Sequence, residues 1–488
     1  MKQLCLLIAF LIAAAPSLAD PITVDLEHTD AGWRLLRDGE PYRVQGAGGQ
    51  EQLDLLADCG GNSIRTWGVG DETLALLDEA HAHGITVTLG IWIEHERHGF
   101  DYGDFESVAR QFEMVREAVL AYKDHPAVLM WGIGNEMEGY EEGSDPAIWS
   151  HIEACAAMVK RLDPHHPTMT VIAEIGGRKV EAINRLCPSI DIIGINSYGG
   201  AASVPERYAA LESAKPYIVT EFGPLGPWEL GRTSFGAVEE ATSSQKAEMY
   251  RSAYNAIDDD RVNGLGSYAF LWGNKNEATT TWFGMLLDDG SKVNTVDAMA
   301  VCWSGEVPGD LCPAIQPLAV AEGYASTDPG GTVRVTLSAT DPEGGDLTAE
   351  WLFMADAMTY VTGGDEIAQP PTYPELISAA DVNGCEIVLP DRPGVYRLAV
   401  VVKDAAGNAA TANIPVHVAS NEPVQSEAIN LPAVVYAEDG SAMPWTPSGY
   451  MGTADAIAMD PAHSDDTHAG DTCLRVNYNA NGEWGGVV

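Results

Sequence analysis

The feature that most constrains the fold is a regular alternation of helical and β-rich segments through roughly the first 300 residues. Segments with a helical period end at glycine or proline, and each is followed by a short run rich in β-branched and aromatic residues. Eight β-rich runs are expected, at residues 42–46, 62–67, 85–92, 127–133, 168–173, 191–196, 217–221 and 264–272. Eight such units in roughly 260 residues are what a closed (β/α)8 TIM barrel requires. The pattern therefore predicts an α/β chain built on that barrel.

An open, doubly wound sheet is the alternative that the same alternation allows. Such sheets usually carry a glycine-rich phosphate loop after their first strand, with the spacing GxGxxG. The candidate segment here, GAGGQEQ at residues 46–52, lacks that spacing, and no acidic ribose ligand is evident. The closed barrel is the better interpretation.

The composition and the hydrophobic period of the sequence change after Cys302, which suggests further domains. A segment rich in proline and glycine is followed by runs that alternate apolar and polar residues with period two, which is typical of an immunoglobulin-like β-sandwich. A last β-rich segment carries several aromatic residues and resembles a partial carbohydrate-binding module. The expected division is a signal peptide at 1–19, the barrel at 20–302, a linker at 303–317, the sandwich at 318–420 and the partial module at 425–488.

The N-terminus and the overall charge bear on location and partners. MKQLCLLIAFLIAAAPSLAD has a positive start, an apolar core and a small-residue cleavage site, which predicts a secreted protein, extracellular or periplasmic. Lys and Arg number 27 against 71 Asp and Glu, a formal net charge of -44. That charge disfavours nucleic acids and anionic membranes as partners.

Cysteine and histidine usage argues against a metal site. No CxxC pair occurs, and the segment EHERH at 94–98 lacks the helical spacing of zinc-binding histidines. We expect neither a metal nor a cofactor. Cys302 and Cys312 flank the proline- and glycine-rich linker, and in an oxidising compartment we expect a disulfide between them.

Two glutamates mark the candidate site. The apolar run at 127–133 ends in Asn135-Glu136, and the seventh β-rich run ends in Glu221. In a barrel, residues at the carboxyl ends of the strands share one mouth, so both side chains should enter one cavity. Glycoside hydrolysis uses a pair of carboxyl groups in one cleft. Glu136 and Glu221, with Arg65 and Tyr198 beside them, meet that requirement.

Four segments resemble a known group of enzymes: GIGNEME at 132–138, INSYGG at 195–200, PYIVTEFGP at 216–224 and SYAFLWG at 267–273. They resemble the clan A retaining glycoside hydrolases, most closely the catalytic barrel of glycoside hydrolase family 2. Weaker likenesses connect the chain to family 5 and to barrels active on β-1,3-glucan. The resemblance covers about residues 40 to 305 and implies a (β/α)8 hydrolase.

The resemblance also implies roles for individual residues. Glu221 would be the nucleophile and Glu136 the acid/base, while Arg65 and Tyr198 would hold Glu221 ionised and oriented. Asn135 would bind a sugar 2-hydroxyl. The substrate-binding residues expected in all are Arg65, Trp92, Asn135, Asn196, Tyr198, Trp272 and Trp282.

Three functions remain open at this point. The leading hypothesis is a secreted retaining β-glycosidase that acts on a β-linked polysaccharide or oligosaccharide, with a β-glucan as the first candidate. A transglycosylase would use the same residues with a sugar acceptor in place of water. A non-catalytic carbohydrate-binding protein is the third hypothesis. The presence of both Glu136 and Glu221 argues against it, because binding alone does not require the two glutamates.

Overall fold

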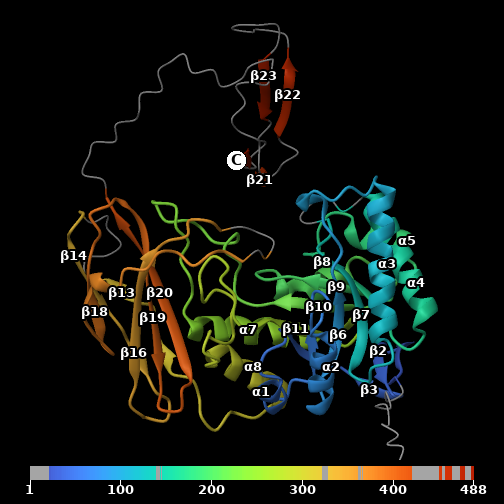
Figure 1. Ribbon diagram of the computed structural model, residues 1–488, viewed down its shortest axis with the longest axis horizontal. Helices are drawn as coiled ribbons and strands as arrows, with labels where there is room; N and C mark the ends of the chain where they lie inside the picture. Colours follow the sequence, from blue (N-terminus) through green and yellow to red (C-terminus); the bar gives the residue numbers. More distant parts are fainter. Residues whose placement is uncertain are drawn as a thin grey trace, which may run out of the picture. The chain divides into compact units, whose positions relative to one another are not determined.

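The computed structural model describes residues 21–138, 143, 145–320, 328–360, 364 and 366–419, together with the backbone of four short strands beyond residue 449. The chain separates into two units, Met1–Ala419 and Ser420–Val488. The first unit contains a barrel and a β-sandwich (Figure 1).

Eight parallel strands form a closed barrel and confirm the expected α/β class. They are β4 (Val44–Gly49), β5 (Ser63–Arg65), β6 (Thr86–Ile91), β7 (Val128–Asn135), β8 (Thr168–Ala173), β9 (Ile192–Asn196), β10 (Tyr217–Phe222) and β11 (Gly264–Trp272). The barrel closes in the order β10-β11-β4-β5-β6-β7-β8-β9. Each strand overlaps the run expected for it. All residues of β6, β8 and β10 are buried, because helices cover the outer face of a parallel sheet and side chains fill the inner one.

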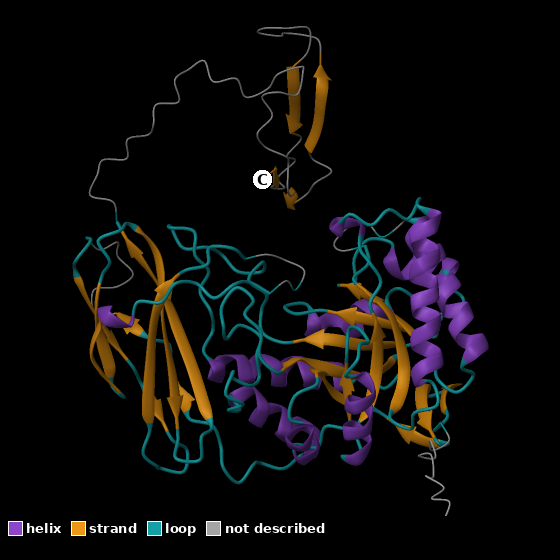
Figure 2. Ribbon diagram, in the orientation of Figure 1, coloured by secondary structure: helices purple, strands orange, loops and turns teal. Residues whose placement is uncertain are grey.

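Helices follow the strands on the outside of the barrel (Figure 2). They are α1 (Leu53–Asp58), α2 (Thr73–Ala82), α3 (Phe105–Tyr122), α4 (Pro146–Leu162), α5 (Lys179–Leu186), α6 (Val204–Ala209), α7 (Ser243–Asp258) and α8 (Asn294–Ser304), with short 3-10 turns at Glu96–His98, Ala201–Ser203 and Pro374–Leu376. Local caps fix several starts: Asp104 and Asp145 each accept a backbone N–H in the first turn of α3 and α4. Thr242 and Gln245 form a reciprocal capping box at the start of α7.

A small antiparallel sheet closes the end of the barrel opposite its carboxyl ends. It consists of β1 (Val24–Thr29), β2 (Gly32–Arg37) and β3 (Glu40–Tyr42), in the order β1-β2-β3. Val24 and Leu35 of this sheet share an apolar cluster with Leu129 and Met130, near the start of β7. The end of the barrel that receives this sheet is therefore filled, which leaves the carboxyl ends of the strands for chemistry.

The expected β-sandwich follows the barrel. One sheet has the order β13 (Ala319–Val320), β14 (Thr332–Thr336), β18 (Gly384–Val388), β17 (Ile377–Asp381), and the other β16 (Thr348–Ala355), β19 (Gly394–Lys403), β20 (Ala409–Val418). Alternate residues of β14 are buried, so period two marks the inward face. The segment expected to be a linker already contributes to this domain. It contains β12 (Ala314–Ile315), which pairs with β15 (Ala339–Thr340), and Ile315 lies in the sandwich core.

The disulfide predicted between Cys302 and Cys312 is wrong, because both cysteines are free. Cys302 packs against the barrel core from the last turns of α8. Cys312 is buried, and its thiol donates to the carbonyl of Lys292 while its backbone N–H donates to Asp297 Oδ2 at 2.6 Å. Each sulfur is thus fixed in its own packing environment.

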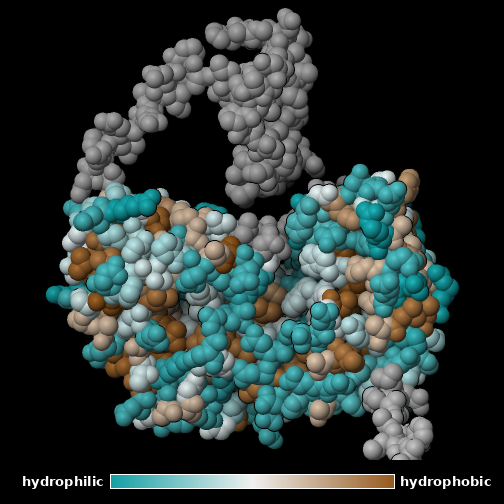
Figure 3. Space-filling model, in the orientation of Figure 1, coloured by the Kyte–Doolittle hydropathy of each residue, from teal (hydrophilic) through white to brown (hydrophobic). Residues whose placement is uncertain are grey.

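Two expectations fall outside the described residues, namely the signal peptide at 1–19 and most of the module at 425–488. In the latter, backbone is described only for β21 (Tyr450–Gly452), β22 (Ile457–His463), β23 (Cys473–Tyr478) and β24 (Gly485–Val487). Within the part of the chain that was searched, no helix is long and apolar enough to cross a membrane. Hydrophilic side chains cover much of the face that Figure 3 shows for the first unit, as the acidic composition leads one to expect.

Candidate active site

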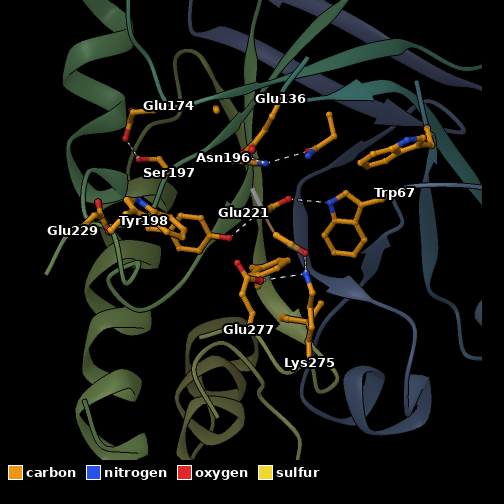
Figure 4. A pocket seen from close by; sticks show the side chains of 17 residues that line it. Trp67, Glu136, Glu174, Asn196, Ser197, Tyr198, Glu221, Glu229, Lys275 and Glu277 are labelled. Carbon is orange, nitrogen blue, oxygen red and sulfur yellow. Dashed lines mark hydrogen bonds and ion pairs between the residues drawn. The ribbon is translucent and has the colours of Figure 1, made fainter. Parts of the chain in front are cut away.

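A cavity of about 470 Å³ opens at the carboxyl ends of the barrel strands. Asn135, Glu136, Asn196, Tyr198 and Glu221 are among the residues that line it, so residues from β7, β9 and β10 meet there. The two glutamates singled out from the sequence therefore share one pocket (Figure 4).

Glu221 lies within β10 and is buried, with three donors on its carboxylate. Arg65 Nη1 donates to Oε1 at 2.8 Å, and Trp67 Nε1 donates to the same oxygen at 3.0 Å. The Tyr198 hydroxyl donates to Oε2 at 2.8 Å. The Arg65–Glu221 ion pair is buried at both ends, with side-chain exposures of 3% and 8%. The guanidinium balances the negative charge, and the three bonds together fix the direction of the carboxylate.

Glu136 occupies a different environment directly after β7. Its backbone has a φ of 53°, in the left-handed region that non-glycine residues seldom adopt, and its N–H donates to Val171 O at 2.9 Å. Asn196 Nδ2 donates to its Oε1 at 2.8 Å. Burial, together with the nearby negative charge of Glu221, raises the pKa of Glu136 to about 7. Glu136 is thus suited to hold a proton at mildly acidic pH.

Asn135 is oriented by the same network. Its Oδ1 accepts from Arg65 Nη2 at 2.6 Å and from Asn196 Nδ2 at 3.1 Å. His95 Nε2 lies 2.6 Å from the Asn135 carbonyl oxygen, to which it donates, and burial lowers the pKa of His95. With Oδ1 turned toward Arg65, the Asn135 amide can offer its NH₂ group to a ligand in the pocket.

A second acidic group forms another side of the pocket. Glu174 accepts from Ser197 Oγ at 2.5 Å and from Arg207 Nη1 at 2.7 Å. Burial alone would raise the pKa of Glu174, but the bonds from Arg207, Ser197 and the Ile175 N–H outweigh it, and the pKa is lowered. Burial raises the pKa of Glu229, although that carboxylate accepts from the backbone N–H groups of Gly226 and Gly199.

Five of the seven residues proposed for substrate binding lie at the pocket. Trp92, Asn135, Asn196 and Tyr198 line the pocket. Arg65 lies behind Glu221, where it contacts the carboxylate.

Trp272 and Trp282 do not line the pocket, contrary to our expectation. Both are fully buried, with exposures of 0% and 1%. Trp272 Nε1 donates to Glu51 O at 2.7 Å, and Trp282 Nε1 donates to Leu225 O at 2.9 Å. These two rings therefore pack the barrel and its loops instead of facing a ligand.

Several lining residues were missed by sequence reasoning. Trp67 could have been found, because it ends the β-rich run expected at 62–67 and lies two residues beyond Arg65, and alternate residues of an extended run share a face. Other lining residues lie on loops without a periodic signal, or on a strand buried on both faces, among them Trp228, Glu229, Phe270, Lys275 and Glu277. Among the described residues, no group of three or more His, Cys, Asp or Glu side chains is placed to hold a metal ion.

Comparison with known proteins shows which proteins the barrel resembles. Residues 65–254 match the family model for glycosyl hydrolases family 2, TIM barrel domain. The β-glucuronidase of Mus musculus is 26% identical over 274 residues, which cover 49% of this chain and 39% of that protein. The β-glucuronidase of Streptococcus agalactiae serotype V is 25% identical over 196 residues, covering 35% of this chain and 32% of that protein.

Solved structures with a similar fold include a β-D-glucuronidase from Dictyoglomus thermophilum, at 20% identity and a TM-score of 0.46, covering 59% of this chain and 54% of that one. A family 2 β-galacturonidase from Eisenbergiella tayi has 17% identity and a TM-score of 0.46, covering 58% of this chain and 54% of that one. This chain spans only about two fifths of the length of the mouse enzyme. Over residues 65–254, this chain is therefore similar to the TIM barrel domain of family 2 glycosyl hydrolases.

Proposed function

We propose that this chain is a retaining β-glycosidase in which Glu221 is the nucleophile and Glu136 the acid/base. One observation carries the proposal: two glutamates share a pocket but have opposite surroundings. Three donors bind the carboxylate of Glu221, whereas Glu136 has a pKa raised to about 7. A pair of carboxyls separated in this way can divide the tasks of nucleophile and acid.

The first step would form a glycosyl-enzyme. Oε2 of Glu221, which accepts from the Tyr198 hydroxyl, would attack the anomeric carbon. The bond from that carbon to the leaving oxygen breaks, and the proton of Glu136 passes to that oxygen. In the second step Glu136 takes a proton from water, the resulting hydroxide attacks the anomeric carbon, and Glu221 is released as a carboxylate.

Trapping of the intermediate tests these roles. A 2-deoxy-2-fluoro-β-glycosyl fluoride slows both steps, but its good leaving group permits the first, so the enzyme should gain the mass of one sugar. Digestion should place that mass on the peptide that contains Glu221. A sugar attached to any other residue, or a first-formed product with the α configuration, would refute the assignment.

The substrate is proposed to be a neutral β-linked glycan, with a β-glucan as the first candidate. Glutamates line the pocket at positions 136, 174, 221, 229 and 277, and Lys275 is the one cationic residue among the described lining residues. Lys275 is itself paired with Glu277 at 3.2 Å. A uronate would bring a further negative charge into this acidic pocket, where the described lining residues offer no cation without a carboxylate partner.

The relatives named β-glucuronidases make glucuronides the competing substrate class. A panel of aryl β-glycosides decides between them, with the glucoside, galactoside, mannoside, xyloside and glucuronide compared by kcat/KM. β-Glucans follow, with sizing of the products to separate hydrolysis from transfer to a sugar acceptor. A glucuronide preferred over every neutral glycoside would overturn the substrate proposal and leave the roles of the two glutamates intact.

Export remains a proposal that rests on the first twenty residues of the sequence. Expression of the full chain followed by fractionation and N-terminal sequencing tests it. Cleavage after Ala19 is the expected result, and an intact N-terminus in the cytoplasm is the contrary one.

A further inference from the structure

One side of the candidate active site includes a residue of the β-sandwich. Gly364, which follows β16 in the sandwich, lines the same pocket as Glu136 and Glu221. It lies beside Lys275 and Glu277, which the barrel contributes from the loop after β11. Figure 4 shows Lys275 and Glu277 next to one another in this part of the pocket.

Hydrogen bonds join the two domains at this point. The Lys275 ammonium donates to Gly364 O, and it also pairs with Glu277 Oε2 at 3.2 Å. Next to it, Asn276 and Ile367 exchange two bonds: Ile367 N donates to Asn276 O at 2.8 Å, and Asn276 Nδ2 donates to Ile367 O at 2.9 Å. The barrel loop that carries Lys275 and Glu277 is therefore held by the sandwich.

Tyr360 adds an apolar contact. This sandwich residue is buried in one cluster with Phe270 and Leu271, which line the pocket, and Tyr198 and Trp67 pack against the same cluster. The Tyr360 hydroxyl donates to Asp356 Oδ1 at 2.7 Å and accepts from Val238 N at 3.3 Å. Its ring thus lies in one apolar cluster with Ala278, a residue of the loop that carries Lys275 and Glu277.

A buried ion pair fixes this part of the sandwich. Arg397 of β19 pairs with Asp356 at 2.7 Å, and the two side chains are 4% and 1% exposed. Arg397 Nη2 also donates to Val238 O of the barrel at 3.0 Å. Separating the partners of such a deeply buried ion pair leaves an uncompensated charge, which strongly destabilises the fold. The pair therefore favours the one relative position of the two domains in which these contacts form.

We propose that the sandwich is a working part of the substrate pocket, and that Asn276 and Tyr360 are positioning residues that hold Lys275 and Glu277 toward the bound sugar. A paired ammonium and carboxylate offer donors and acceptors side by side, which suits neighbouring hydroxyls of a neutral sugar. This inference rests on the proposed glycosidase function.

Two variants of the full chain test the proposal. Asn276→Ala removes one bond to the sandwich, and Tyr360→Phe removes the hydroxyl but keeps the ring. Tyr373→Phe is the matched control, because its aromatic contacts are with Phe353 and Tyr396 inside the sandwich. The measurements are KM and kcat on a neutral β-linked oligosaccharide, and hydrogen exchange of the peptide covering residues 273–282.

Each of the two variants should raise KM about five-fold, the effect of roughly one hydrogen bond, while kcat changes less than about two-fold. Exchange of peptide 273–282 should become faster in both, and the control should match the wild type. Faster exchange with an unchanged KM would overturn the role in binding, and unchanged exchange would overturn the positioning itself. Should the wild type turn over no glycoside, the proposed function fails, and the exchange measurement still decides whether the sandwich positions the loop.

Discussion

The raised pKa of Glu136 leads to a sharp prediction about pH dependence. Burial and the charge of Glu221 raise that pKa to about 7, so the proton is present below pH 7 and is lost as the pH rises through it. At pH 6 such a group is about 90% protonated, whereas a carboxyl with the ordinary value of 4.5 would be about 3% protonated. Because the first step needs that proton, kcat/KM for an alkyl β-glycoside should fall about ten-fold per pH unit above 7.

Replacement of Glu136 by Gln removes the proton but keeps the size of the side chain and an acceptor for Asn196 Nδ2. General acid catalysis contributes about 10²- to 10⁴-fold, so kcat/KM on an alkyl glycoside should fall by that factor. A 2,4-dinitrophenyl glycoside needs little protonation, so its first step should be nearly unaffected. With this activated substrate, the fall in kcat/KM near pH 7 should also disappear in the variant.

Initial rates from about pH 4 to 9 on both substrates provide the measurement. Glu113→Gln is a suitable control, because Glu113 is an exposed carboxylate on α3 whose partner is Arg116. The control should keep the wild-type profile. If the kcat/KM of Glu136→Gln on the alkyl glycoside still falls above pH 7, another group supplies the proton. The same follows if kcat/KM falls equally on both substrates, and in either case the role given to Glu136 is wrong.

Three other changes probe the site and the scaffold. Trp67→Phe deletes one donor to Glu221 Oε1 and should lower kcat by about 10- to 150-fold, since a hydrogen bond to a charged group contributes about 1.5–3 kcal/mol. An unchanged kcat would contradict a role for Trp67 in the site. Lys246→Met leaves buried Glu240 without its ion-pair partner and should lower the free energy of unfolding in urea by about 3–5 kcal/mol, and a loss below about 1 kcal/mol would contradict this. Dithiothreitol should shift the Tm of the first unit by less than about 1 °C, because the cysteines among its described residues are free, and a larger fall would reveal a disulfide.

Much of the barrel was predictable because hydrophobic period and chain order determine it. Each barrel strand lies within a few residues of its expected position. The Arg65, Tyr198 and Glu221 cluster was also predictable, because all three lie at or just after the carboxyl ends of barrel strands. In such cases local sequence and topology agree, and no long-range detail is needed.

The errors have a different physical origin. Every residue of β11 is buried, so alternation could not tell whether Trp272 faces the pocket or packs elsewhere. Lys275 and Glu277 lie on a loop whose position depends on contacts with residues roughly 90 positions later, such as Gly364 and Ile367. Contacts of that kind leave no trace in a local pattern. The disulfide failed for a related reason, since proximity in sequence does not determine which way two thiols point.

The different surroundings of the two glutamates follow from how each leaves its strand. Glu221 is still inside β10, so its side chain enters the interior, where Arg65 and Tyr198 already point. Glu136 lies one residue past the end of β7 with a φ of 53°, a conformation that costs a non-glycine residue about 1–3 kcal/mol. Its N–H is nevertheless bonded to Val171 O of β8, so pairing with the next strand offsets the strain.

Glu174 repeats this arrangement one strand further along the barrel. It follows β8 with a φ of 59°, and its N–H donates to Asn196 O of β9 at 2.8 Å. In both places the left-handed turn brings the carboxylate to a residue at the end of β9: Glu136 accepts from Asn196 and Glu174 accepts from Ser197. The outcomes differ because Arg207 pairs with Glu174, so that its pKa is lowered, whereas burial and the charge of Glu221 raise the pKa of Glu136. The same left-handed backbone conformation thus directs two carboxyl groups toward the end of β9, and the charge next to each decides which of them keeps its proton.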